Sequence, residues 1–254
     1  MIREDIASIL EKFNPVGLEE MNSIRLMNRT DSKYVFSIRK LPELLKLAIN
    51  QYHILQIDNK RDFLYSTVYM DTSEFLFFNQ HIKGKLPRFK VRYRLYEHND
   101  QSFLEVKCKT SKNITNKNRI INRLTKDNID STGIIFLRDY IPIDTLNLKP
   151  VLTSRFVRLT LVGLETSERI TIDYNMSFSD NTGKVIELPL LAIAELKKEQ
   201  FNNKSVFGKL IKEFNIRQTG FSKYCIGMSL LYNLPKQNTL KRKFMQISKI
   251  ERES

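Results

Sequence analysis

Charged residues alternate with apolar ones along several stretches of the sequence, at the spacing of a β-strand. The clearest stretch is residues 90–96, which reads Lys-Val-Arg-Tyr-Arg-Leu-Tyr. Because successive side chains of a strand point to opposite faces, Lys90, Arg92 and Arg94 share one face. Adjacent cations on one face repel one another. This face is therefore expected either to lie open to water or to meet a dense anion.

The alternation recurs with other charged residues. Glu105 and Lys107 share one strand face, and so do Glu195 and Lys197. Glu105 is expected to pair with neighbouring cations. Glu195 lies between apolar residues, where a lone carboxylate is costly, so it is either a metal ligand or an ion-pair partner of a cation. Besides residues 90–96, the stretches in which charged and apolar residues alternate are 103–109, 168–173 and 192–197.

The composition is that of a basic globular protein. Of its 254 residues 41% are hydrophobic, enough for a real core, and the formal net charge is +14. Such an excess predicts an acidic partner: nucleic acid, an anionic membrane or a polyphosphorylated small molecule. Two cysteines, Cys108 and Cys225, form no disulfide or zinc framework and fit a reducing compartment. With neither a signal peptide nor a transmembrane segment in the sequence, a cytoplasmic location is expected.

The elements that position the charged residues are mainly strands. About eight strand segments with short helices between them, and no regular βαβ alternation, predict an α+β fold with an antiparallel sheet. Eight such strands can close into a barrel whose alternate side chains point inward. We therefore expect an antiparallel eight-stranded β-barrel with flanking short helices, in which a charged inner face would line a wet tunnel.

One domain is expected over residues 1–234, followed by a basic and flexible C-terminal tail over residues 235–254. Residues 110–123 are polar, basic and rich in Asn, which predicts a mobile loop. Asp71 ends a predicted strand and is interpreted as a turn residue. The histidines show no metal-binding spacing and are predicted to be surface or loop residues; they are His53, His81 and His98.

Seven short motifs follow one another along the chain. They are RTDSKY at 29–34, VRYRLY at 91–96, EVK at 105–107, FVR at 156–158, RITID at 169–173, AELK at 194–197 and FSKY at 221–224. Their order resembles the VTC domain, the polyphosphate polymerase domain of the vacuolar transporter chaperone complex. That domain belongs to the triphosphate tunnel metalloenzymes, which are relatives of the CYTH phosphatases. The resemblance covers about residues 22–233.

The resemblance implies a tunnel that is lined by basic residues and binds a triphosphate or polyphosphate chain with a divalent metal. Glu195 would hold Mn²⁺ or Mg²⁺, and ATP would donate its γ-phosphate to a growing chain. Lys90, Lys197 and Ser222 would bind the substrate. The residues that the resemblance predicts to be catalytic, as phosphate ligands, are Lys33, Arg92, Arg94, Lys107, Arg158, Arg169 and Lys223.

These residue types suit phosphoryl transfer, which needs alignment and charge neutralisation more than covalent help from the protein. Arginine binds phosphate oxygens in a bidentate manner, and one carboxylate suffices for Mg²⁺ when the substrate supplies further oxygens. The first motif, residues 29–34, lacks the acidic pair expected in CYTH phosphatases. This departure favours the polymerase branch of the group.

Other functions stay open. A tripolyphosphatase or polyphosphatase would use the same tunnel, and a non-catalytic polyphosphate sensor would need the cations but not Glu195. A nucleic-acid-binding sheet would need aromatic and basic residues on one face, whereas Tyr93 and the arginines of residues 90–96 lie on opposite faces, so no nucleic acid is expected. The chain also lacks the membrane anchor of the eukaryotic complex; a membrane-protein partner for the product and the oligomeric state are left open.

Overall fold

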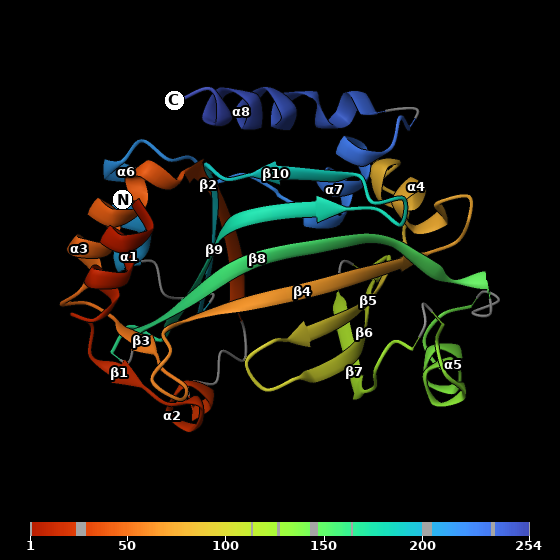
Figure 1. The fold of residues 1–254 in the computed structure, drawn as a ribbon, viewed down its shortest axis with the longest axis horizontal. Helices are drawn as coiled ribbons and strands as arrows, with labels where there is room; N and C mark the ends of the chain where they lie inside the picture. Colours follow the sequence, from red (N-terminus) through yellow and green to blue (C-terminus); the bar gives the residue numbers. More distant parts are fainter. Residues whose placement is uncertain are drawn as a thin grey trace.

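The protein is built around one large sheet with short helices on both faces. The computed structural model describes residues 2–23, 29–112, 114–125, 128–142, 147–163, 165–199, 205–234 and 237–253. Each strand in the main path of the sheet is antiparallel to its neighbours, as predicted, and Figure 1 shows the long strands β4, β8 and β9 running side by side. In the order of the sheet, the strands are β2 (Arg29–Ser37), β11 (Leu191–Glu199), β9 (Glu168–Ser179), β8 (Lys149–Gly163), β4 (Asp62–Asp71), β5 (Arg88–Tyr96), β6 (Gln101–Lys109) and β7 (Thr115–Ile121).

The sheet is curved but not closed, so the prediction of a complete barrel is wrong. Its two end strands, β2 and β7, do not pair in the described part of the chain. The curvature still brings the two ends of the sheet toward each other, because Lys33 of β2 and Lys107 of β6 line one cavity. Three short strands extend the sheet at its margins: β1 (Pro15–Val16), β3 (His53–Leu55) and β10 (Val185–Leu188).

The convex face of the sheet is covered by three amphipathic helices, α1 (Ile2–Leu10), α3 (Leu41–Ala48) and α6 (Val206–Glu213). Their apolar residues share one hydrophobic core with alternate residues of the strands, such as Phe36 of β2 and Ala194 of β11. Because alternate residues of a strand point to opposite faces, this packing sends Lys33, Val35, Ile193 and Glu195 to the concave face. The hydrophobic core on the convex face therefore determines which side chains of β2 and β11 lie on the concave face.

The concave face has an apolar half, which is filled by α7 (Lys223–Leu231). This helix is buried almost all round, and its residues form a second core with Val35, Phe178 and Ile193. A β-carbon on Gly227 would lie 2.6 Å from Cδ1 of Phe178, so glycine lets the helix approach the sheet closely. The first residues of α7 consequently face the polar half of the curve.

Asp71 anchors α7, although the sequence suggested only a turn residue. The carboxylate is fully buried at the end of β4. It accepts backbone hydrogen bonds from Phe77 at 2.9 Å and Phe78 at 3.0 Å, at the start of α4 (Leu76–Ile82), and another from the hydroxyl of Tyr224. Burial raises the pKa of Asp71 against the effect of these donors. One carboxylate thus joins β4, α4 and α7.

Two predictions about loops are corrected by the structure. Residues 115–121, expected in a mobile loop, form β7, which pairs with β6 over its whole length. In the expected flexible tail, residues 237–251 form a 3₁₀ turn (Gln237–Leu240) and the helix α8 (Lys241–Glu251), which crosses one end of the molecule in Figure 1. The tail is ordered because Ile247 and Ile250 are buried and Gln246 donates a hydrogen bond to the backbone of Val35.

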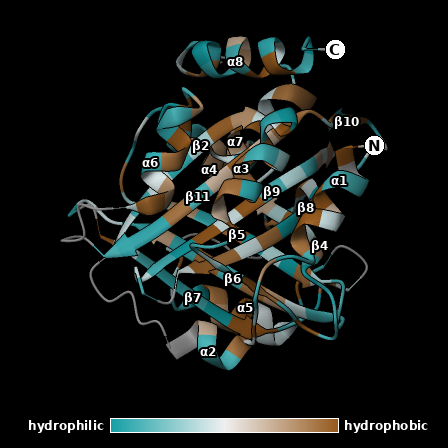
Figure 2. Cartoon of the chain, turned by 90° about the vertical axis from the view of Figure 1, so that its left-hand side faces the viewer, coloured by the Kyte–Doolittle hydropathy of each residue, from teal (hydrophilic) through white to brown (hydrophobic). Residues whose placement is uncertain are grey.

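Hydrophilic residues lie along the strands of the sheet as well as on the surfaces of the helices. Figure 2 shows hydrophilic colour along β7 and the end of β11, with hydrophobic segments interleaved in the other strands. In β5 the alternation is as predicted, since Val91 and Tyr93 are buried in the core. The remaining helices are α2 (Leu18–Ser23), α5 (Ser131–Arg138) and the 3₁₀ turn Ile38–Lys40. No helix in the described residues is long and apolar enough to cross a membrane.

Replacing Tyr224 by Phe should lower the free energy of unfolding by about 1.5–3 kcal/mol, because the buried carboxylate of Asp71 loses a hydrogen bond. Chemical denaturation monitored by circular dichroism measures this change. Tyr232→Phe is the control, since its hydroxyl donates to the uncharged backbone carbonyl of Val151, at 2.8 Å, and not to a carboxylate. Equal losses for both variants would contradict the anchoring role of Asp71.

Candidate anion-binding site

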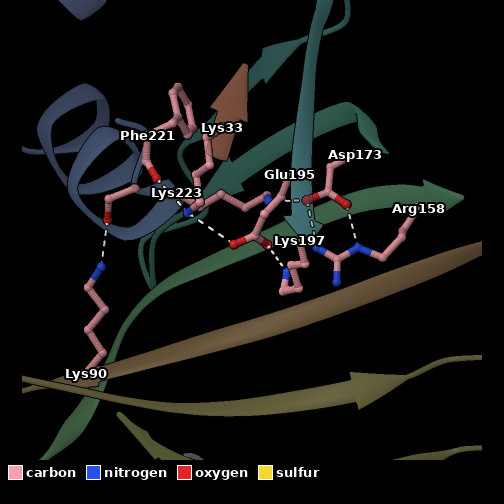
Figure 3. Close-up of polar contacts among 9 residues, drawn as sticks. Lys33, Lys90, Arg158, Asp173, Glu195, Lys197, Phe221 and Lys223 are labelled. Atoms are coloured by element: carbon pink, nitrogen blue, oxygen red, sulfur yellow. Dashed lines mark hydrogen bonds and ion pairs between the residues drawn. The ribbon is translucent and has the colours of Figure 1, made fainter. Parts of the chain in front are cut away.

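The polar half of the concave face gathers the cations that the sequence singled out. They come from six strands and from the start of α7, and each buried carboxylate among them contacts two or three cations. Figure 3 shows two of these carboxylates, Asp173 and Glu195, with the side chains that surround them. The face therefore carries a clear excess of positive charge.

The first cluster surrounds Glu195 of β11. One carboxylate oxygen lies 2.8 Å from Nζ of Lys197 and the other 4.0 Å from Nζ of Lys33. Burial raises the pKa of Glu195, but Lys197, Lys33 and Arg158 outweigh burial and hold the pKa at about 2. Glu195 is thus ionised at neutral pH, and about a quarter of its side chain is exposed.

The second cluster surrounds Asp173 of β9. Arg158 of β8 donates Nε and Nη2 hydrogen bonds of 2.6 and 2.8 Å to its two oxygens, and Lys223 of α7 donates another. These cations hold the pKa of Asp173 well below its usual range despite burial. The structure thus pairs Asp173, the last residue of the motif at 169–173, with Arg158 and Lys223. Arg155, three residues before Arg158, is exposed.

The third cluster surrounds Glu105 of β6, which is almost completely buried. Its oxygens lie 2.7 Å from Nε of Arg92, 2.7 Å from Nζ of Lys117 and 3.9 Å from Arg94. Burial raises the pKa of Glu105, and the three cations lower it to about 2. The prediction that Glu105 pairs with cations is confirmed. Lys117 lies on β7, in the segment that the sequence suggested was a loop.

The start of α7 closes one side of the site. Ser222 caps the helix by accepting a hydrogen bond from the backbone N–H of Cys225 at 3.2 Å, and it also accepts one from Nζ of Lys90 at 3.0 Å. Nζ of Lys33 donates to the carbonyl of Phe221 at 3.0 Å. Figure 3 shows these contacts linking β2, β5 and α7. The helix N-terminus adds its positive dipole end to the cations.

Several polar atoms on this face have no protein partner among the described residues. Nε of Arg94 is buried without a hydrogen-bond acceptor, as are the hydroxyls of Thr67, Ser154 and Thr171. Thr67 pairs with Arg94, and Thr171 pairs with Glu195, so both lie beside the charged clusters. An arginine donor without an acceptor in a buried site is costly, and a bound anion or water would satisfy it.

The remaining predicted residues lie on the same face. Lys107 of β6 pairs with Lys90 across the strands and lines a cavity together with Lys33. Arg169 of β9 pairs with Lys197 of β11 in the sheet register, two residues from the position opposite Glu195. Strand parity places Arg169 on the side of Thr171 and Asp173. The structure thus brings all eleven predicted residues to one face or to the helix end beside it.

Lys117 and His81 lie in this region, although the sequence analysis did not assign them to the site. Lys117 belongs to an alternating run, Asn-Lys-Asn-Arg at 116–119, that could have been interpreted as a strand. His81, predicted to be a surface residue, lines the cavity from α4, and burial and nearby cations lower its pKa to about 3. No sequence signal marked His81, because its position depends on how α4 packs.

The residues present fit a divalent metal only when a substrate supplies further ligands. Within the described ranges, no three His, Cys, Asp or Glu side chains form a metal-binding group. Glu195 is ionised and partly exposed, which suits one carboxylate ligand of Mg²⁺ or Mn²⁺. Magnesium commonly binds one or two carboxylates, water and substrate phosphate. The site therefore suits a metal that arrives with a phosphate chain.

Comparison with known proteins gives the family. The VTC domain matches residues 28–133 and 137–232. This chain belongs to the VTC domain family. The match includes every predicted site residue and leaves α8 outside. No curated protein matches the sequence.

Solved structures share the fold at low sequence identity. One is a putative adenylyl cyclase, HpAC1 from Hippeastrum, described as having a dominant triphosphatase activity; it is 17% identical with a TM-score of 0.51, and the alignment covers 83% of this chain and 99% of that one. Another is a putative adenylate cyclase from Vibrio parahaemolyticus, 11% identical with a TM-score of 0.46, covering 79% and 97%. The first likeness supports the curved antiparallel sheet of a triphosphate tunnel fold.

Lys90→Met should stabilise the free protein. Burial lowers the pKa of Lys90 to about 7, below the ordinary 10.5, with help from the charges of Lys33, Lys107 and Arg92. Between these values the unfolded chain holds more protons, so Lys90 makes stability rise with pH from about 7 to 10.5. At pH 6 the variant should gain about 1–2 kcal/mol in free energy of unfolding.

Denaturation of the parent and of Lys90→Met at pH 6 and pH 9 measures this difference. Lys149→Met, an exposed lysine on β8, serves as the control. A variant that is less stable than the parent at pH 6 would show that Lys90 is not held in a repulsive environment.

Proposed function

We propose that this protein is a polyphosphate polymerase-like phosphotransferase. In this reaction an oxygen of the terminal phosphate of a polyphosphate chain attacks the γ-phosphorus of ATP. The bond from the γ-phosphorus to the β–γ bridging oxygen breaks, and ADP leaves. The concave face would bind the phosphates of both reactants.

The excess of cations over carboxylates on a closed-in face is the observation that carries this proposal. Glu105, Asp173 and Glu195 are each outnumbered by their cationic neighbours. Among the residues that the structure describes, none accepts a hydrogen bond from the buried Nε of Arg94. Polyphosphate brings one negative charge or more at each phosphate and would neutralise this excess. Fixed cations aimed at phosphate oxygens also stabilise the charge that develops during phosphoryl transfer.

The carboxylates favour a phosphate acceptor over water. Burial raises the pKa values of Glu105 and Glu195, but their cation neighbours lower both to about 2, and the pKa of Asp173 is lowered as well. Such carboxylates are weak bases for removing a proton from water at neutral pH. The terminal phosphate of a chain is already ionised and needs no base. The weak basicity of these three carboxylates therefore supports transfer to a phosphate chain over transfer to water.

Glu195 would hold Mn²⁺ or Mg²⁺ with oxygens of the substrate. Bound there, the metal would neutralise phosphate charge and orient the transferring group. Lys33 and Lys197 would keep Glu195 ionised, while Arg94, Arg158 and Lys223 would orient the phosphates.

Tripolyphosphate hydrolysis is the second candidate, and the fold relative HpAC1, described as a triphosphatase, favours it. Phosphorus NMR of the protein with ATP, Mn²⁺ and a polyphosphate primer separates the two reactions. Growth of the signal from internal chain phosphates with release of ADP is expected. Orthophosphate alone would contradict polymerisation and support hydrolysis, and no turnover of ATP, tripolyphosphate or polyphosphate would contradict both.

Arg94→Ala should lower kcat/KM by a factor equivalent to about 2–4 kcal/mol, the usual loss for one preorganised charge contact. Arg155→Ala is the matched control, because Arg155 is an exposed arginine on the same strand as Arg158, β8. Steady-state assays of ADP release at several ATP concentrations measure both variants. Equal activity of Arg94→Ala and the parent would contradict the site.

A further inference from the structure

A cavity of about 720 Å³ extends the concave face toward the C-terminal helix. It begins among Lys33, Lys90 and Lys107, which belong to the proposed site, and continues to residues that the site has not used. Six of its lining residues are lysines or arginines, and one, Asp31, is a carboxylate. The further basic residues are His81, Arg88, Lys109 and Lys243.

Lys243 reaches this cavity from α8, which lies outside the segment matched by the VTC family. A β-carbon on Gly220 would lie 3.6 Å from Nζ of Lys243, so the ammonium group lies beside the loop that leads into α7. Ile247 and Ile250 hold the helix against the protein. No carboxylate lies within ion-pair distance of Lys243 in the described part of the chain.

Cations outnumber carboxylates around the cavity, as they do on the concave face. His81 adds a buried Nδ1 that has no hydrogen-bond partner among the described residues. Arg88 of β5 is paired with Lys109 of β6. This pair lies two residues along each strand from the pair of Lys90 and Lys107. Strand alternation then aligns two rows of cations that lead away from the reacting region. A row of equally spaced cations matches a linear polyanion better than a compact one.

We propose that this cavity binds the distal phosphates of an inorganic polyphosphate chain whose reacting end lies on the concave face, and that Lys243 extends the site beyond the length of a triphosphate. This inference rests on the proposed function, because it assigns a chain to the same site. It assigns to α8, which the family segment does not include, a role in selecting long chains over short ones.

The test compares binding of three probes to the purified full chain by isothermal titration calorimetry: tripolyphosphate, ATP and a long-chain polyphosphate. Lys243→Ala should weaken binding of the long chain by about tenfold, the loss expected for one charge-assisted contact. The loss for tripolyphosphate should be clearly smaller. Lys249→Ala, an exposed lysine on the same helix, is the matched control and should change none of the three.

The outcomes separate the two proposals. If the parent binds neither tripolyphosphate nor long polyphosphate, the proposed function fails. If the parent binds both and Lys243→Ala weakens neither or weakens both equally, the chain-binding cavity is overturned. If Lys243→Ala weakens the binding of ATP alone, the cavity receives the nucleotide, and the proposal that it binds a polyphosphate chain is overturned. Lys109→Ala tests the opposite wall and should show the same preference for long chains, so a folding defect in one variant leaves the proposal testable.

Discussion

Mutual repulsion among cations on the concave face is the constraint around which the rest of the structure is arranged. Three carboxylates, Glu105, Asp173 and the partly exposed Glu195, offset part of this repulsion, and each is held ionised by the cations around it. The offset is incomplete, because cations outnumber these carboxylates; the charges of Lys33, Lys107 and Arg92 add to burial in lowering the pKa of Lys90. Folding therefore maintains a positive field that a polyanion would relieve.

The other elements keep that field in place. Helices on the convex face fix the parity of β2 and β11, and therefore the direction of Lys33 and Glu195. The apolar half of the concave face is filled by α7, whose anchoring through Tyr224 and Asp71 places Ser222 and Lys223 against the charged half. The sheet remains open between β2 and β7, and the cavity toward α8 borders these ends. A long chain would thus have a path out of the site.

The order of the motifs made most of the site predictable, because the family resemblance named the cations and Glu195. Strand alternation added that Arg92 and Arg94 lie on the face opposite Tyr93. What the sequence could not provide depends on packing between distant elements. Asp173 pairs with Lys223 because α7 enters the curve, and His81 reaches the cavity because α4 packs beside it. The open sheet was missed because alternation does not report closure, and α8 was missed because its buried face has only a few apolar residues.

The measurement that tests the central claim most directly is the melting temperature of the parent in tripolyphosphate, compared with sodium chloride at the same ionic strength and without added metal. A ligand that binds only the folded protein at about 100 times its Kd adds about 2.7 kcal/mol, or a rise of about 5–10 °C for a domain of this size. We predict such a rise in tripolyphosphate and a much smaller one in chloride. Equal shifts in both salts would show general screening and contradict a built polyanion site.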